Sequence, residues 1–205
     1  MANFEDDLRF IQVPAALPAI QARTEELKFN RASEVRTGSL LQLLAAAKPG
    51  GRFLELGTGT GMGAAWLLSG MDTASTLVSI EIDEGLQEVA RQALGSDQRL
   101  KLMSCDAAGF LWRQPKKTFD LVFADATPGK YEALDEALAI VKIGGYYVID
   151  DMLPQPNWPD GHEDKVSTLM DRLEGDQRFF KLALPWASGI VVLVRKPRKA
   201  VPLES

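Results

Sequence analysis

The sequence predicts an α/β fold: a doubly wound, mostly parallel sheet of seven strands with helices on both faces and an antiparallel C-terminal strand. Two observations predict it. From residue 51 onward, short apolar runs alternate with segments of helical periodicity, as in parallel strands joined by crossover helices. The last two apolar runs, residues 179–184 and 190–194, have only a loop between them, so they are expected to pair antiparallel.

The first fifty residues are expected to form an N-terminal helical extension of the same single domain. Helix-like stretches cover residues 14–29 and 33–47, and the second carries an apolar stripe that includes Leu40, Leu41 and Leu44. That stripe is consistent with a helix packed on the sheet edge, a lid over the site, or the contact face of a homodimer. The core is expected over residues 51–195, followed by a basic tail at 196–205.

The core elements follow in order from the apolar pattern. The run FDLVFA at residues 119–124 is nearly continuous, as expected of a strand covered on both faces. The remaining strands are expected at 53–56, 77–80, 100–103, 146–149, 179–184 and 190–194. Helices are expected at 64–68, 86–93, 107–112, 131–141 and 166–173. We expect Gly144 and Gly145 to end the fourth of these helices.

Composition restricts the environment and the partners of the chain. With Cys105 as the only cysteine, no intrachain disulfide can form, which favours a reducing, cytoplasmic location. No apolar run approaches the ~20 residues that span a bilayer, and the acidic N-terminus lacks a signal sequence, so no membrane partner is expected. A net charge of −5 argues against a large nucleic-acid footprint, with the run RKPRK at 195–199 as the one exception.

The most informative stretch is RFLELGTGTGMG at residues 52–63, a strand that turns through glycines into a helix. Gly57, Gly59 and Gly61 give G-x-G-x-G, whereas Gly59, Gly61 and Ala64 give the dinucleotide pattern G-x-G-x-x-A. The first interpretation is favoured because Gly57 lies at the strand end and Glu55 stands two residues before it. Either interpretation indicates a nucleotide-like cofactor.

Acidic residues follow five consecutive predicted strands. In order they are Glu55, Glu81, Asp106, Asp125 and the pair Asp150–Asp151. Ligands of an open parallel sheet bind outside these strand ends. Glu81 lies 24 residues after Gly57, close to the spacing of ~20 for an acid that binds ribose hydroxyls. Asp106 is expected either to be a loop acid or helix N-cap, or to accept a hydrogen bond from an adenine amino group.

The last three acids predict a metal site. Asp125, Asp150 and Asp151 are expected at neighbouring strand ends, and no lysine stands beside the pair in the sequence. Clustered carboxylates repel one another unless cations or hydrogen-bond donors compensate their charge. Oxygen ligands of this kind suit a hard divalent cation such as Mg²⁺ or Ca²⁺.

Several of these blocks resemble a known family. The string E-x-G-x-G-x-G resembles the cofactor loop of S-adenosylmethionine (SAM) dependent methyltransferases of the Rossmann-like class. FADATPGKY and GGYYVIDDML resemble the two metal-binding blocks of the cation-dependent O-methyltransferases, which include the catechol and caffeoyl-CoA enzymes. The resemblance covers residues 39–153. It implies the methyltransferase sheet, in which the final strand is antiparallel.

The resemblance also implies site residues. Asp125 and Asp150 match the two aspartate ligands of the metal, and Asp151 stands where the family usually has asparagine. Expected contacts to SAM come from Glu55, Gly57, Thr58, Gly59, Gly61, Glu81, Asp106 and Asp125. The family's catalytic lysine, three residues after the first aspartate, is replaced by Pro128. Lys130 is a candidate substitute that would act with Asp125, or it is a solvated lysine at a helix start.

The loop after residue 153 supplies further candidates. His162, the only histidine, is expected to be a surface residue or a helix cap, in a loop that overhangs the fifth strand. Trp158 and Trp186 are expected either to pack in the core or to form an apolar wall for a planar acceptor.

The sequence therefore predicts a SAM-dependent O-methyltransferase that acts on a hydroxyl of a small planar acceptor, assisted by Mg²⁺ or a similar cation. Three alternatives stay open at this point. The second glycine interpretation would suit an NAD-dependent oxidoreductase, and the basic tail would suit an RNA methyltransferase. A SAM-binding module without catalysis would be consistent with the missing lysine.

Overall fold

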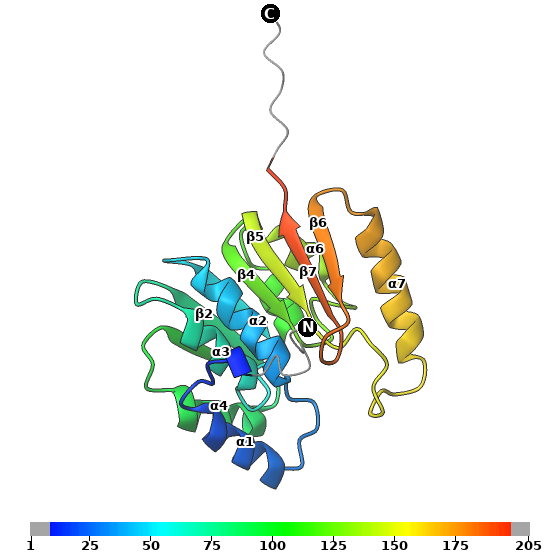
Figure 1. Ribbon diagram of the computed structural model, residues 1–205. Helices are drawn as coiled ribbons and strands as arrows, with labels where there is room; N and C mark the ends of the chain where they lie inside the picture. Colours follow the sequence, from blue (N-terminus) through cyan, green and yellow to red (C-terminus); the bar gives the residue numbers. More distant parts are fainter. Residues whose placement is uncertain (1–8, 198–205) are drawn as a thin grey trace, which may run out of the picture.

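The computed structural model describes residues 9–197 and contains one seven-stranded sheet in the order β3-β2-β1-β4-β5-β7-β6 (Figure 1). The strands are β1 (Arg52–Leu56), β2 (Thr76–Glu81), β3 (Leu100–Ser104), β4 (Phe119–Ala124), β5 (Val141–Ile149), β6 (Phe179–Leu184) and β7 (Ile190–Arg195). The helices are α1 (Leu17–Glu26), α2 (Val35–Ala46), α3 (Met62–Gly70), α4 (Glu84–Leu94), α5 (Ala107–Leu111), α6 (Leu134–Ala139) and α7 (His162–Gly175). The predicted fold class is confirmed.

The C-terminal strands are arranged as the sequence predicts. Strands β1 to β5 pair in parallel, whereas β7 runs antiparallel to both of its neighbours. Val194 of β7 lies opposite Tyr146 on one side and Phe180 on the other. β7 is therefore the inner strand and β6 the edge strand, as expected for the methyltransferase sheet.

The sheet separates two apolar cores because successive side chains of a strand point to opposite faces. In β1, Leu54 and Leu56 belong to the core on the side of α5, α6 and α7. Phe53 belongs to the other core, with residues of α1 to α4 such as Trp66, which is fully buried. Both faces of the central strands are thus covered, which explains the continuous apolar runs in the sequence.

The N-terminal extension contains the two predicted helices. α2 packs against α3, with Leu41 fully buried and Gly38 against the indole of Trp66. Figure 1 shows α1 at the lower edge of the sheet in that view, the edge where the parallel strands end. The link between α1 and α2 carries Phe29, Arg31 and Ser33 into the pockets described below. The extension therefore both packs on the core and covers the site.

One predicted boundary is wrong. Residues 131–141 do not form a helix that ends at Gly144: α6 stops at Ala139, and β5 already begins at Val141. Val141 pairs with Phe119 of β4, and the register then shifts, so the two glycines lie in an irregularity within β5. The pairing of β5 with β4 therefore decides the structure of these residues, although their apolar spacing is helical.

The basic run at residues 195–199 divides into two parts. Arg195 ends β7, and its guanidinium Nη1 donates hydrogen bonds to the carbonyl oxygens of Leu138, Ala139 and Val141. Arg195 therefore satisfies acceptors at the end of α6. Arg198 and Lys199 lie outside the described residues. In residues 9–197, every helix is too short or too polar to cross a membrane.

Candidate active site

Two adjoining pockets lie at the carboxyl ends of the parallel strands. The donor pocket, of ≈ 250 Å³, lies over the glycine turn and reaches Glu81. The acceptor pocket, of ≈ 360 Å³, lies over the ends of β4 and β5 and is partly bounded by the loop before α7. Arg31, Ser33, Asp125 and Thr127 line both pockets. Ligands in the two pockets would therefore meet at this shared wall.

The glycine turn adopts the conformation that the first sequence interpretation requires. Gly57, Gly59 and Gly61 have φ angles of 96°, 51° and 99°, in the left-handed region that favours glycine. A Cβ atom at Gly57 would lie 2.6 Å from the carbonyl oxygen of Asp125, and one at Gly59 would lie 3.2 Å from the Phe29 ring. The turn thus needs glycine for both its conformation and its close contacts.

Two threonines in this turn fix it to its surroundings. The Thr58 hydroxyl is 2.6 Å from that of Ser79 in β2, and Thr58 also lines the donor pocket. Thr60 accepts a hydrogen bond of 2.8 Å from the hydroxyl of Thr24 in α1. The N-terminal helix is therefore connected directly to the turn.

Glu81, the last residue of β2, lies in the donor pocket as predicted. Its Oε2 atom accepts a hydrogen bond of 2.8 Å from the Gly59 amide, and Oε1 accepts from the amides of Ile82 and Asp83. A carboxylate has about four lone-pair sites, so it can accept a further hydrogen bond from a ligand.

Glu55 and Asp106, two of the residues expected to contact SAM, do not line the donor pocket. Glu55 is 1% exposed, and burial raises the pKa of its carboxyl to about 8. Ser79 donates a hydrogen bond to its Oε2, whereas its Oε1 has no hydrogen-bond partner in the described chain. Asp106 instead caps α5 by accepting hydrogen bonds from the amides of Ala108 and Gly109.

The three acids predicted as metal ligands do converge at the acceptor pocket. Asp125 follows β4 and Asp150 follows β5, and these strands are neighbours in the sheet. Burial and the nearby charge of Asp150 raise the pKa of Asp125 to about 7, and burial also raises the pKa of Asp150. The backbone of the next residue, Asp151, lies in the left-handed region, at φ 63°.

Each of these carboxyl groups accepts hydrogen bonds from the protein. Ser33 Oγ donates to Asp125 Oδ2 at 3.0 Å, and Ser188 Oγ donates to Asp150 Oδ1 at 2.5 Å. Trp158 Nε1 donates to Asp151 Oδ1 at 2.7 Å. Within residues 9–197, no group of three or more His, Cys, Asp or Glu side chains is arranged to hold a metal ion.

Lys130 lies among these acids. Its side chain is 5% exposed, so it is not a solvated lysine. The ammonium Nζ donates to the carbonyl oxygen of Asp150 at 2.9 Å and lies 3.9 Å from Asp125 Oδ1. Lys130 therefore places a positive charge beside the carboxyl groups that were expected to bind a cation.

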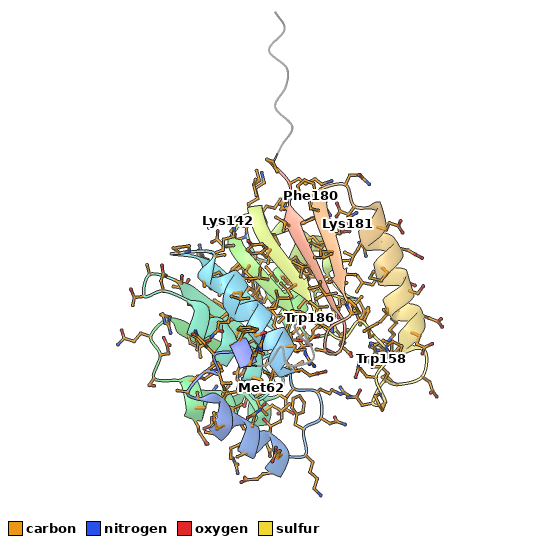
Figure 2. All side chains as sticks on the ribbon, in the orientation of Figure 1. Met62, Lys142, Trp158, Phe180, Lys181 and Trp186 are labelled. Carbon is orange, nitrogen blue, oxygen red and sulfur yellow. The ribbon has the colours of Figure 1, made fainter. Side chains whose placement is uncertain are left out.

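Aromatic side chains also line the acceptor pocket and form what we call its aromatic wall, made of Tyr131, Trp158 and His162. His162 begins α7, and its Nε2 lies 3.1 Å from the Tyr131 hydroxyl and 3.7 Å from Asp151 Oδ2. The rings of His162 and Trp158 are 4.5 Å apart, and burial lowers the pKa of His162. Figure 2 shows Trp158 in the loop before α7 and Trp186 in the β6–β7 loop. Trp158 lines the pocket, whereas Trp186 is 43% exposed and lies outside both pockets.

Comparison with known proteins identifies the family. A model of a methyltransferase domain matches residues 54–152. A Mycobacterium ulcerans protein named "Putative O-methyltransferase" is 30% identical over 168 residues, which are 77% of this chain and 75% of that protein. The chain belongs to the SAM-dependent O-methyltransferase family. This membership confirms the predicted enzyme class over the NAD-dependent alternative.

Solved structures of other methyltransferases share the fold. The O-methyltransferase TomG of Streptomyces achromogenes, solved in complex with SAM, has a TM-score of 0.78 at 24% identity, covering 96% of this chain and 100% of that one. The O-methyltransferase of Bacillus cereus, solved with SAH, has a TM-score of 0.76 at 20% identity, covering 94% and 95% of the two chains.

Several site residues of this O-methyltransferase were not predicted from the sequence. Tyr131 adjoins Lys130 in the block FADATPGKY, so the metal-site resemblance could have suggested it. Ser33 and Ser188 had no such signal, because they reach Asp125 and Asp150 from loops 92 and 38 residues away in the sequence. His162, expected as a surface residue or a helix cap, begins α7 and lines the acceptor pocket.

Proposed function

We propose that this O-methyltransferase binds SAM in the donor pocket and a small planar acceptor with a free hydroxyl in the acceptor pocket. The observation that carries the proposal is the wall that the pockets share, formed by Arg31, Ser33, Asp125 and Thr127. A transferase must bring the methyl carbon of one ligand against the oxygen of the other. Two pockets that meet at a common wall meet this requirement.

In the donor pocket, the proposed contacts come from the glycine turn and from Glu81. With no side chain at Gly57 or Gly59, the cofactor can approach the backbone closely. Glu81 would accept a hydrogen bond from a ribose hydroxyl while its other bonds hold the turn. Asp125 lies at the junction with the acceptor pocket, where its carboxyl can face the positively charged sulfonium.

In the acceptor pocket, the aromatic wall favours a flat molecule. Trp158, Tyr131 and His162 supply ring surfaces and polar tips on one side. Lys130 and Asp125 line the same pocket, and the hydroxyl would point toward them. In the reaction, a lone pair of the acceptor oxygen forms a bond to the methyl carbon, the carbon–sulfur bond breaks with its electrons going to sulfur, and the hydroxyl proton passes to the Asp125 carboxylate. Orientation supplies most of the acceleration.

The divalent cation implied by the family resemblance has no part in this proposal. Serine, tryptophan and backbone groups already donate hydrogen bonds to Asp125, Asp150 and Asp151, and the Lys130 ammonium lies 3.9 Å from Asp125 Oδ1. These residues do not fit a metal ion as they are arranged here.

The acceptor class can be tested with labelled SAM. Catechols, hydroxycinnamoyl thioesters and tRNA would be offered in parallel, and label transfer to each would be measured. We expect transfer to a small hydroxylated aromatic compound and a rise in melting temperature with SAM but not with NAD. Transfer to tRNA alone would contradict the proposed acceptor, and a melting temperature that SAM leaves unchanged would contradict the donor assignment.

A further inference from the structure

We propose that the Lys130 ammonium supplies the positive charge that the family resemblance assigns to a divalent cation, so that methyl transfer by this chain needs no metal ion. The inference rests on the proposed function, because the lysine acts on the wall of the acceptor pocket. It goes further because it identifies the Lys130 ammonium as the positive charge that stabilises the acidic residues of that wall.

The position of the ammonium carries the inference. Nζ lies between the ends of β4 and β5, bonded to the Asp150 carbonyl oxygen at 2.9 Å and 3.9 Å from Asp125 Oδ1. An ammonium has three N–H donors. The Asp150 carbonyl oxygen uses one of them, Asp125 lies beyond hydrogen-bond distance, and Lys130 also lines the acceptor pocket. The remaining donors are thus available for an acceptor oxygen.

The backbone before Lys130 explains how the side chain reaches this position. Pro128 occupies the place of the family's lysine, and Gly129 follows with a φ of 91°. The Gly129 amide donates to the Glu132 carbonyl oxygen at 2.7 Å, and the Tyr131 amide donates to that of Thr127 at 2.9 Å. This tight turn directs Lys130 inward. The same turn therefore contains both the proline at the family's lysine position and the buried Lys130.

A metal ion would compete with this arrangement. It would share Asp125 and Asp150 with the hydrogen bonds that Ser33 and Ser188 donate to them. It would also stand within a few ångströms of a buried ammonium, and like charges at that distance repel strongly where water is excluded. Removal of the ammonium should therefore create a metal site that the wild type lacks.

The test compares Lys130→Met, which keeps the chain length without the charge, with Lys142→Met. Lys142 is a matched control because it also pairs with an aspartate, Asp120, at 2.7 Å. It lies at the other end of the strands, away from the acceptor pocket (Figure 2). Melting temperatures with and without Mn²⁺, Mn²⁺ calorimetry, and transfer rates in EDTA would be measured for all three proteins.

We expect EDTA to leave wild-type transfer unchanged and Mn²⁺ to leave its melting temperature unchanged. Lys130→Met should lose about 100-fold in transfer rate, the size typical of one lost donor at a reacting oxygen. It should also gain a Mn²⁺-dependent rise in melting temperature. Lys142→Met should behave as wild type. A structural role alone would not produce the gained metal response.

Loss of wild-type transfer in EDTA with recovery in Mg²⁺ or Mn²⁺ would overturn the inference, as would a wild-type Mn²⁺ response equal to that of Lys130→Met. If Lys130→Met does not fold, Lys130→Arg keeps the charge and should stay independent of metal; a metal requirement in that variant would overturn the inference. SAM is the separate control: a wild type that SAM fails to stabilise would refute the proposed function, whatever the metal result.

Discussion

The buried carboxyl of Glu55 makes the stability of the protein depend on pH. Its pKa rises from 4.5 to about 8, mainly because burial disfavours the charged form. The folded state therefore holds a proton that the unfolded chain releases at lower pH. Below pH 4.5 the Glu55 carboxyl does not reduce the free energy of unfolding, and the reduction grows as pH rises toward 8. At neutral pH the reduction is about 3 kcal/mol, from 1.36 kcal/mol per pKa unit.

Glu55→Gln removes the titration while keeping the size and polarity of the side chain. We expect wild type and variant to have similar unfolding free energies at about pH 5. Near pH 7 the variant should be more stable by about 3 kcal/mol. Urea unfolding followed by circular dichroism across this range measures the difference. Glu174→Gln, at an exposed position of α7, is the control and should show no such trend.

Parallel stability curves for wild type and Glu55→Gln would refute the reasoning, because a neutral buried Glu55 requires them to diverge. SAM affinity gives a second check. Since Glu55 does not line the donor pocket, the variant should bind SAM as wild type does. A large loss of SAM affinity in a folded variant would instead support the direct contact that the sequence predicted.

Three further substitutions test the two pockets. Gly59→Val, at φ 51° and against the Phe29 ring, should weaken SAM binding at least about tenfold by calorimetry, whereas Gly175→Ala, in open space, should not. Trp158→Ala should raise the acceptor KM about tenfold at unchanged SAM affinity, and Trp186→Ala should change neither; equal effects would contradict the aromatic wall. Thr24→Val removes a bond to the glycine turn and should lower the free energy of unfolding by about 1 kcal/mol; an unchanged urea midpoint would contradict this.

The local sequence was enough to predict the sheet, because each strand and each turn carries its own pattern. It was not enough at residues 131–141, where pairing of Val141 with Phe119 decides the boundary between α6 and β5. That pairing depends on a neighbour in space, and helical spacing within the segment cannot reveal it.

The acids at the strand ends show the same limit at the level of side chains. Glu81 is the last residue of β2 and leaves the sheet at its edge, whereas Glu55 precedes the last residue of β1 and points into the core beneath α3. The register pairs Glu55 with Ser79, so Glu81 lies on the same face two positions further along, beyond the end of β1. Asp106 had a competing local signal, since an aspartate before a helix is a common N-cap.

The metal prediction rested on repulsion among three carboxylates. In the structure, separate protein groups lie beside these carboxylates. Lys130 lies between Asp125 and Asp150. Asp151, in the left-handed conformation, turns away to Trp158 and His162. The carboxylate at the family's asparagine position thus belongs to the aromatic wall and not to the other two acids. Because each of the three carboxyl groups has a hydrogen-bond donor in the protein, an acidic cluster in the sequence does not by itself require a cation.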